Sequence, residues 1–107
     1  MTNVLDIAAT HAATYMDNLG RRPIVAAAGL TDLRRRLGKP LPEQGLPDDA
    51  VIEELVRDTE GGILGSGSGR FFGWVIGGAL PVAVAADWLT AAWDQNAASN
   101  ATAPAEA

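Results

Sequence analysis

Most of the 12 glycines of this 107-residue chain lie between residues 61 and 78. Glycine has no Cβ atom, so a segment rich in it can turn sharply and approach other backbone closely. It also loses more conformational entropy on folding than other residues, which disfavours a regular helix or strand. We therefore predict an irregular connector over residues 61–80. The aromatic and β-branched side chains of residues 71–76 favour a short extended piece within it.

Helical patterns occur on both sides of this connector. Apolar residues recur at three- and four-residue spacing over residues 3–19, where Asn3 is placed to cap the first turn. A short segment begins at a second cap, Thr31, and a third helix begins at about Pro47. The last pattern covers residues 81–98. We expect a mainly α chain of about four helices with a Gly-rich extended connector.

Large apolar side chains are scarce, although 48% of the residues are hydrophobic. Much of that share is alanine, which buries little area per residue. Four of the six aromatic residues lie between residues 71 and 88, so the core or an interface should centre there. A chain of this length buries only about two-thirds of the surface that its unfolded form exposes, which leaves room for a partner.

The balance of charge argues against nucleic-acid binding. Eight basic and thirteen acidic residues give a formal charge of −5, and a net negative chain repels a phosphate backbone. The chain has no cysteine, which excludes a disulfide framework, a thiolate metal site and a cysteine nucleophile.

Residues 71–86 carry no charge and have to be weighed as a membrane span. Sixteen residues fall short of the roughly 20 that a helix needs to cross a bilayer, and Pro81 divides them. The N-terminal stretch carries Asp6, His11 and Asp17 where a signal peptide would be apolar. We therefore expect a cytoplasmic protein with no membrane segment.

Two features suggest anion binding but have simpler explanations. The alternate glycines Gly65, Gly67 and Gly69 match neither phosphate-loop pattern, and no strand-turn-helix pattern surrounds them, so a flexible connector is favoured. The basic cluster formed by residues 34–36 and Lys39 could bind an anion or an acidic partner. Such runs are more often a solvated helix face, which here would face the acidic third helix.

The remaining titratable groups do not form a catalytic set. His11, the only histidine, has no second ligand at metal spacing and is expected to be a packed or solvent-edge imidazole. Asp87 and Asp94 lie seven residues apart, which on a helix separates them by about 10 Å, so they are read as helix-surface charges or caps. The chain does not look like a whole enzyme.

The stretch GRFFGWVIGGALPVAVAADWLTAAWDQNAA carries a family resemblance. Together with the preceding LPEQGLP linker, it resembles the N-terminal region of the group II pyridoxal-phosphate-dependent decarboxylases. This is the family of aromatic-L-amino-acid decarboxylase, and its bacterial members are often labelled aspartate aminotransferase family proteins. The family has two phenylalanines, a small residue and an aromatic residue, and then an aspartate that starts the next helix. The matching positions are Phe71, Phe72, Gly73, Trp74 and Asp87. The family's Ser-Pro-Ala element is echoed by residues 103–105, where the serine is missing.

The resemblance implies a fold-type I enzyme and places part of this chain at the substrate pocket. The positions expected to bind substrate are Trp74, Val75, Ile76, Gly77, Asn96 and Ala98, the last two from across a dimer interface. The aromatic decarboxylases carry Phe-Pro-Thr in place of residues 75–77, so an aromatic amino-acid substrate is not implied. No catalytic, cofactor-binding or metal-binding residue is expected in this chain.

The resemblance also implies a cofactor that this chain does not hold alone. In the family, pyridoxal phosphate is bound by a Schiff-base lysine, an aspartate, a stacking histidine and a phosphate loop. Lys39 and His11 match none of these. The implied partners are a missing C-terminal domain that binds pyridoxal phosphate and a second subunit in a homodimer, with neither nucleic acid nor a membrane as a partner.

Four parts of the chain follow from this reading. Residues 1–60 are expected to form N-terminal helices and a Pro-rich linker that serve dimerisation. Residues 61–80 are the substrate-lining connector, 81–98 a helix leading into the missing cofactor domain, and 99–107 a frayed tail.

Two hypotheses for function remain. The first is an N-terminal fragment of an amino-acid decarboxylase-like carboxy-lyase, which supplies dimer contacts and part of the substrate pocket and is inactive alone. The alternative is a small helical protein-interaction module without catalysis.

Overall fold

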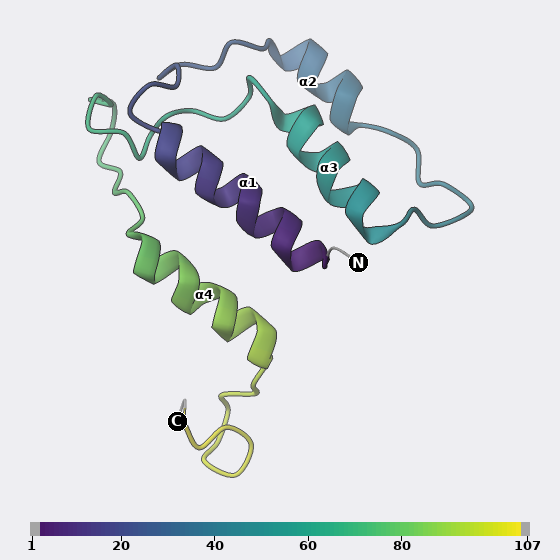
Figure 1. Cartoon of the computed structure of the whole chain (residues 1–107), viewed down its shortest axis with the longest axis vertical. Coiled ribbons are helices and arrows are strands. Elements are labelled where there is room, and N and C mark those ends of the chain that lie inside the picture. The colour runs from purple at the N-terminus through teal and green to yellow at the C-terminus, as the bar shows by residue number, and fades with distance from the viewer. Residues whose placement is uncertain (1–2, 106–107) are drawn as a thin grey trace.

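The computed structural model describes residues 3–105 and contains four helices within them (Figure 1). They are α1 (Val4–Asn18), α2 (Leu30–Leu37), α3 (Asp48–Thr59) and α4 (Pro81–Trp93). Residues 3–105 contain no strand, so the prediction of a mainly α chain is confirmed.

The helix starts follow local capping chemistry, with one error in the prediction. The Asn3 side chain accepts a hydrogen bond from the Leu5 amide at 3.0 Å, as predicted for the cap of α1. Helix α2 starts at Leu30, so the predicted cap Thr31 lies inside its first turn. Helix α3 follows Pro47, and α4 has Pro81 at its first position, where proline's missing N–H costs no hydrogen bond.

Helix α4 ends at Trp93, five residues earlier than the predicted range 81–98. Asp94 takes a left-handed conformation (φ 46°, ψ 48°), which aspartate tolerates better than most residues. Beyond it, the Asn96 side chain accepts a hydrogen bond from the Ala98 amide at 3.1 Å. Short polar side chains compete for backbone groups in this way, and the chain turns instead of continuing the helix.

The predicted extended piece at residues 71–76 does not form a strand. Trp74 has a φ of 51°, so the backbone turns in the middle of the segment. Left-handed backbone costs a non-glycine residue about 1–2 kcal/mol, which sets Trp74 apart from its neighbours.

Helix α3 lies at the centre of the packed part of the chain. The helix pairs that pack closely are α1 with α3 and α2 with α3. His11 of α1 and Glu53 of α3 are joined by a hydrogen bond of 3.0 Å between Nε2 and Oε2. From α2, Arg36 donates through Nη1 to the carbonyl oxygen of Glu60 at 2.9 Å, so it caps the end of α3.

The start of the connector is fixed to the segment before α2. The amides of Ala27 and Ala28 both donate to the carbonyl oxygen of Gly61, at 2.8 and 2.9 Å. Gly61 has a φ of 81°, and a Cβ atom built there would lie 3.2 Å from the Ala28 Cβ. The Gly65 amide donates to the carbonyl oxygen of Ile24 at 3.0 Å. These contacts hold the start of the connector against the segment between α1 and α2. We call α1, α2 and α3, with the segments that join them, the three-helix unit.

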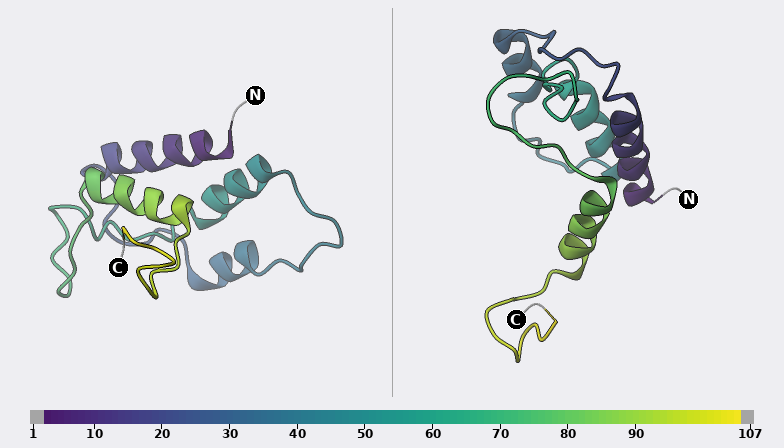
Figure 2. Two further views of the ribbon diagram at one scale, coloured as in Figure 1. Left: turned by 90° about the horizontal axis from the view of Figure 1, so that it is seen from below. Right: turned by 90° about the vertical axis from the view of Figure 1, so that its left-hand side faces the viewer.

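The described chain has almost no apolar core. Ala103 is its one buried hydrophobic residue, while Phe72 and Val75 are almost fully exposed. The radius of gyration is 17.2 Å, whereas a compact domain of this length has about 13 Å. Figures 1 and 2 show why: α4 and the tail extend away from the three-helix unit.

Replacement of Gly61 by alanine should destabilise the three-helix unit by about 1–2 kcal/mol, because the left-handed backbone disfavours any Cβ atom. Urea unfolding followed by helical circular dichroism measures this change. The matched control is Gly45→Ala, where an added Cβ meets no atom within 4 Å. Equal unfolding midpoints for the two variants would contradict the assigned role of Gly61.

Candidate functional site

The predicted substrate-lining residues of the connector lie at the surface. Trp74 is 77% exposed, Val75 is fully exposed and Ile76 is 49% exposed. The Trp74 ring has one aromatic neighbour, Phe71, with ring centroids 6.0 Å apart and planes tilted by 41°. The connector therefore places Phe71 and Trp74 next to each other in a turn. Most of the Trp74 side chain is exposed and is available to contact a further molecule.

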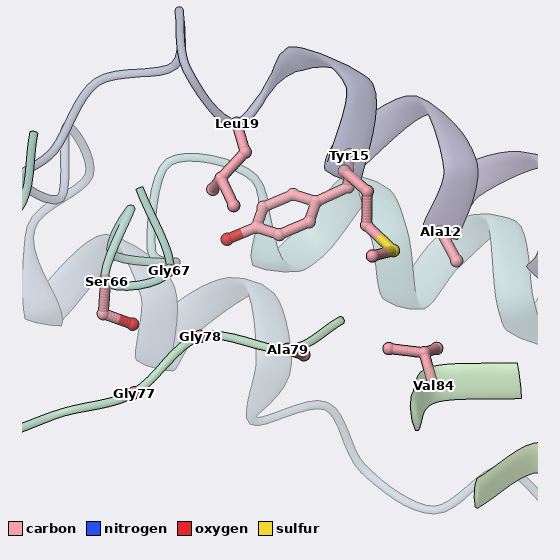
Figure 3. A pocket seen from close by; sticks show the side chains of 10 residues that line it. Ala12, Tyr15, Leu19, Ser66, Gly67, Gly77, Gly78, Ala79 and Val84 are labelled. Carbon is pink, nitrogen blue, oxygen red and sulfur yellow. The ribbon is translucent and has the colours of Figure 1, made fainter. Parts of the chain in front are cut away.

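Of the predicted site residues, Gly77 lines a cleft formed by the described part of the chain. The cleft has a volume of about 440 Å³ and lies between α1, the connector and the start of α4 (Figure 3). Tyr15 and Leu19 form one wall, and the backbone at Gly77 and Gly78 forms the other. The lining carries no charged side chain, so the cleft suits an apolar occupant.

The connector passes close to itself beside this cleft, at Gly67 and Gly78. A Cβ atom added to Gly78 would lie 3.4 Å from the carbonyl oxygen of Gly67, and one added to Gly67 would lie 3.2 Å from Leu19. The absence of a Cβ atom at both positions leaves room for the two backbone segments to approach each other. This close approach is the property predicted from the glycine content.

Asn96 and Ala98 follow the C-terminal end of α4, whereas the connector precedes its first residue. A helix of 13 residues is about 20 Å long. The structure therefore does not bring these two residues together with residues 74–77 inside one chain. Their predicted contribution across a dimer interface remains a prediction.

The residues present do not fit a Schiff-base site for pyridoxal phosphate. The Lys39 ammonium pairs with the carboxylates of Asp58 and Glu54. The hydrogen bond to Asp58, followed by that to Glu54, raises the pKa of Lys39. A Schiff base forms from the neutral amine, which these partners disfavour. His11, the one imidazole, is hydrogen-bonded to Glu53.

The basic cluster forms part of the packing between α2 and α3. Lys39 and Arg36 contact α3 or its end, as predicted for the cluster, whereas Arg35 is exposed and pairs with Asp32 of its own helix. Arg35 and Arg36 pair with Asp32 within α2, and these hydrogen bonds lower the pKa of Asp32. Asp58 is buried, and the Lys39 hydrogen bond lowers its pKa despite the desolvation of its carboxylate.

Several amides in and beside the glycine run bond to other groups of the protein. The amide of Gly65 donates to Ile24, and the amide of Ser68 donates to the Gly65 carbonyl at 3.0 Å. The Arg70 amide donates to the Ser68 hydroxyl oxygen at 3.2 Å. These amides are used inside the protein, as expected for a connector.

Sequence reasoning missed the contacts that join α1 to the connector. The Arg22 guanidinium lies 4.9 Å from the centre of the Tyr15 ring and pairs with Glu60 at 3.1 Å. Arg70 donates through Nη2 to the Arg22 carbonyl oxygen at 2.6 Å. The partners in the last contact are 48 residues apart, and no short motif marks such a pair.

Residues 3–105 contain neither a metal-binding group of side chains nor a membrane-spanning helix. No group of three or more histidine, aspartate or glutamate side chains is placed to hold a metal ion. None of the four helices there has the length and apolar character needed to cross a bilayer.

Comparisons with protein-family models, with curated proteins and with solved structures give no match to this chain. The resemblance to the group II decarboxylases therefore rests only on the residues of this chain named in the sequence analysis, chiefly those at positions 68–104.

Loss of the Lys39 partner should raise the pKa of Asp58. Because the folded pKa lies below the ordinary value of about 3.9, the pair stabilises the fold above that pH and is lost as pH falls through the folded pKa. In Lys39→Gln, the Asp58 carboxyl should titrate at higher pH, measured by its Cγ chemical shift in NMR. Arg34→Gln, which removes a charge from α2 outside this pair, is the control. An unchanged Asp58 titration in Lys39→Gln would refute the pairing.

Proposed function

We propose that this chain is a docking segment of a pyridoxal-phosphate-dependent amino-acid decarboxylase-like enzyme. In this proposal it supplies dimer contacts and part of the substrate pocket, and it is inactive without the domain that binds the cofactor. The resemblance at residues 68–104 supplies the enzyme class. The open structure supports the docking role.

The observation that carries the docking role is the surface area. The chain exposes 8406 Å², whereas a compact monomer of 11.1 kDa exposes about 5,700 Å². The excess is about 2,700 Å² per chain, which is at the upper end of the roughly 1,000–2,500 Å² that each partner buries in an obligate interface. Large apolar side chains of α4 and the connector, such as Val82 and Trp74, contribute to the excess. A chain of this kind gains most of its apolar burial from a partner.

The exposed connector supports the substrate-lining role. Trp74 keeps an unfavourable left-handed backbone although its side chain gains little burial in this chain. Strained residues of this kind occur preferentially at binding sites, where the surrounding structure uses their orientation. In the proposed enzyme, Trp74, Val75 and Ile76 form an apolar wall against the substrate side chain.

The chain's own contribution to the reaction is confined to binding and exclusion of water. No proton donor accompanies the wall, because residues 71–80 carry no titratable side chain. The cofactor and the groups that move protons belong to the partner domain in this proposal. The alternative, an interaction module without catalysis, shares the docking surface but has no use for an ordered aromatic wall.

A chimera tests the proposal. The chain is fused in place of the equivalent N-terminal segment of a group II decarboxylase, and decarboxylation of a panel of amino acids is measured. The chimera should be active and dimeric, and Trp74→Ala should lower its kcat/KM by about tenfold or more, the cost of one lost apolar contact surface.

The matched control for Trp74→Ala is Leu41→Ala in the loop before α3, because Leu41 is 94% exposed and distant from the connector in sequence. A folded, dimeric chimera with no activity on any amino acid would contradict the enzyme role. Equal kcat/KM for the two variants would contradict the proposed contact between Trp74 and the substrate side chain.

A further inference from the structure

A further cleft lies between α1 and α3, inside the three-helix unit. It has a volume of about 340 Å³, and clefts that bind small molecules have volumes of about 300–1,000 Å³. Ala12, Val56 and Ile63 contribute apolar walls, while Arg22 and Glu60 contribute opposite charges. The proposed substrate wall uses none of these side chains. The cleft therefore combines an apolar lining with a few charged groups, as small-molecule sites do.

The Arg22 side chain is held in place at this cleft. Its guanidinium lies 4.9 Å from the centre of the Tyr15 ring, and Nη2 donates to Oε1 of Glu60 at 3.1 Å. The backbone of Arg22 is bonded as well. Its amide donates to the carbonyl oxygen of Asn18 at 3.0 Å, and its carbonyl oxygen accepts from Arg70 at 2.6 Å. Because this guanidinium is already ordered, binding a ligand would cost it little conformational entropy.

Arg22 has hydrogen-bond donors left for an anionic group. A guanidinium carries five N–H donors, and the bond to Glu60 uses one of them. The Arg22 side chain is 24% exposed, and its Nε and Nη1 atoms are not buried. Arginine binds carboxylates especially well, because its planar donors match the two carboxylate oxygens. Arg22 can therefore bind a carboxylate while it stays paired with Glu60.

The charges at this end of the cleft select the class of ligand. Glu60 is 64% exposed and lies beside Arg22, so the cleft presents an anion and a cation next to each other. A ligand with a carboxylate alone would be repelled by Glu60, and a ligand with an amine alone would be repelled by Arg22. The imidazole of the lining, that of His11, is already hydrogen-bonded to Glu53. A free α-amino acid matches this arrangement, because it carries an ammonium and a carboxylate on one carbon atom.

The rest of the cleft suits an apolar side chain. Ile63 is 47% exposed, so part of its surface is available to a ligand. The Thr59 hydroxyl also lines the cleft, but it donates to the carbonyl oxygen of Leu55 at 2.8 Å and is used within α3. A polar ligand side chain would lose its hydrogen bonds to water against Val56 and Ile63, whereas an apolar one would gain burial.

We propose that the cleft between α1 and α3 binds a free α-amino acid with an apolar side chain. Arg22 binds the carboxylate, Glu60 binds the ammonium, and the ligand side chain lies against Val56 and Ile63. The inference goes beyond the proposed function, because it assigns a ligand to the three-helix unit and needs neither the cofactor domain nor residues 74–77.

Titration of the intact chain with L-leucine tests this assignment. Amide NMR spectra should show saturable shifts at residues 22 and 59–63, while the amides of α4 stay unchanged. Two matched ligands are isocaproate, which is leucine without its ammonium, and isoamylamine, which is leucine without its carboxylate. Each should bind at least about tenfold more weakly than leucine, because each loses one charged hydrogen-bonding group.

Variants of the chain locate the site. Arg22→Gln and Glu60→Gln should each weaken leucine binding by about tenfold or more, because each removes one charged partner of the ligand. The matched controls are Arg21→Gln and Glu43→Gln, since neither of these residues lines the cleft. Both controls should bind leucine as the unmodified chain does. Circular dichroism checks that each variant keeps its helices.

Two outcomes would overturn the proposal without any variant: no saturable shift with leucine, or binding of isocaproate or isoamylamine as tight as that of leucine. Leucine binding that a folded Arg22→Gln chain retains unchanged would also overturn it, as would shifts confined to residues outside the cleft. Activity of the chimera does not enter this test, so the proposed function and the amino-acid site can fail separately.

Discussion

The small amount of apolar surface that this chain buries determines how its parts are held together. Helix α3 holds α1 and α2 through half-buried side chains and through charged groups, and the buried carboxylate of Asp58 pairs with Lys39. Polar pairs fix the geometry of such an assembly, but exposed or partly exposed pairs add little net stability. Apolar burial has to come from elsewhere, and the exposed surface of α4 and the connector is available for it.

The Gly-rich connector carries part of the apolar surface that the chain leaves unburied and that the proposed function uses. Gly61 and Gly65 attach its beginning to the segment before α2, and the close approach of Gly67 to Gly78 brings its end close to α1. Between these points the chain displays Phe72, Trp74 and Val75 to solvent. A connector that is fixed at both ends and apolar in the middle can present a shaped surface to another protein. The proposed substrate wall is one use of the surface that this arrangement leaves open.

Local signals in the sequence predicted the helices well. The Asn3 cap, Pro81 and the apolar spacing located α1 and α4, because these signals act within one turn of helix. The end of α4 was predicted too late, since the left-handed Asp94 and the Asn96 side-chain bond override the apolar spacing. The left-handed turn at Trp74 had no sequence signal, because an aromatic residue seldom adopts it.

The candidate site was only partly accessible to sequence reasoning. The resemblance pointed to residues 74–77, and the side chains of residues 74–76 are exposed in this chain because the close helix packing is confined to α1, α2 and α3. The cleft between Tyr15 and Gly77 joins segments about 60 residues apart, and the Arg70–Arg22 contact joins residues 48 positions apart. Pairings over such distances have no local pattern in a single sequence.

Small-angle X-ray scattering of the monomeric chain tests the central claim most directly, because the claim is that the chain does not complete its own core. The account predicts a radius of gyration near 17.2 Å, with α4 extended from the three-helix unit. A compact monomer with a value of about 13 Å would contradict it, because α4 and the connector would then be buried within the chain and would leave no surface for a partner.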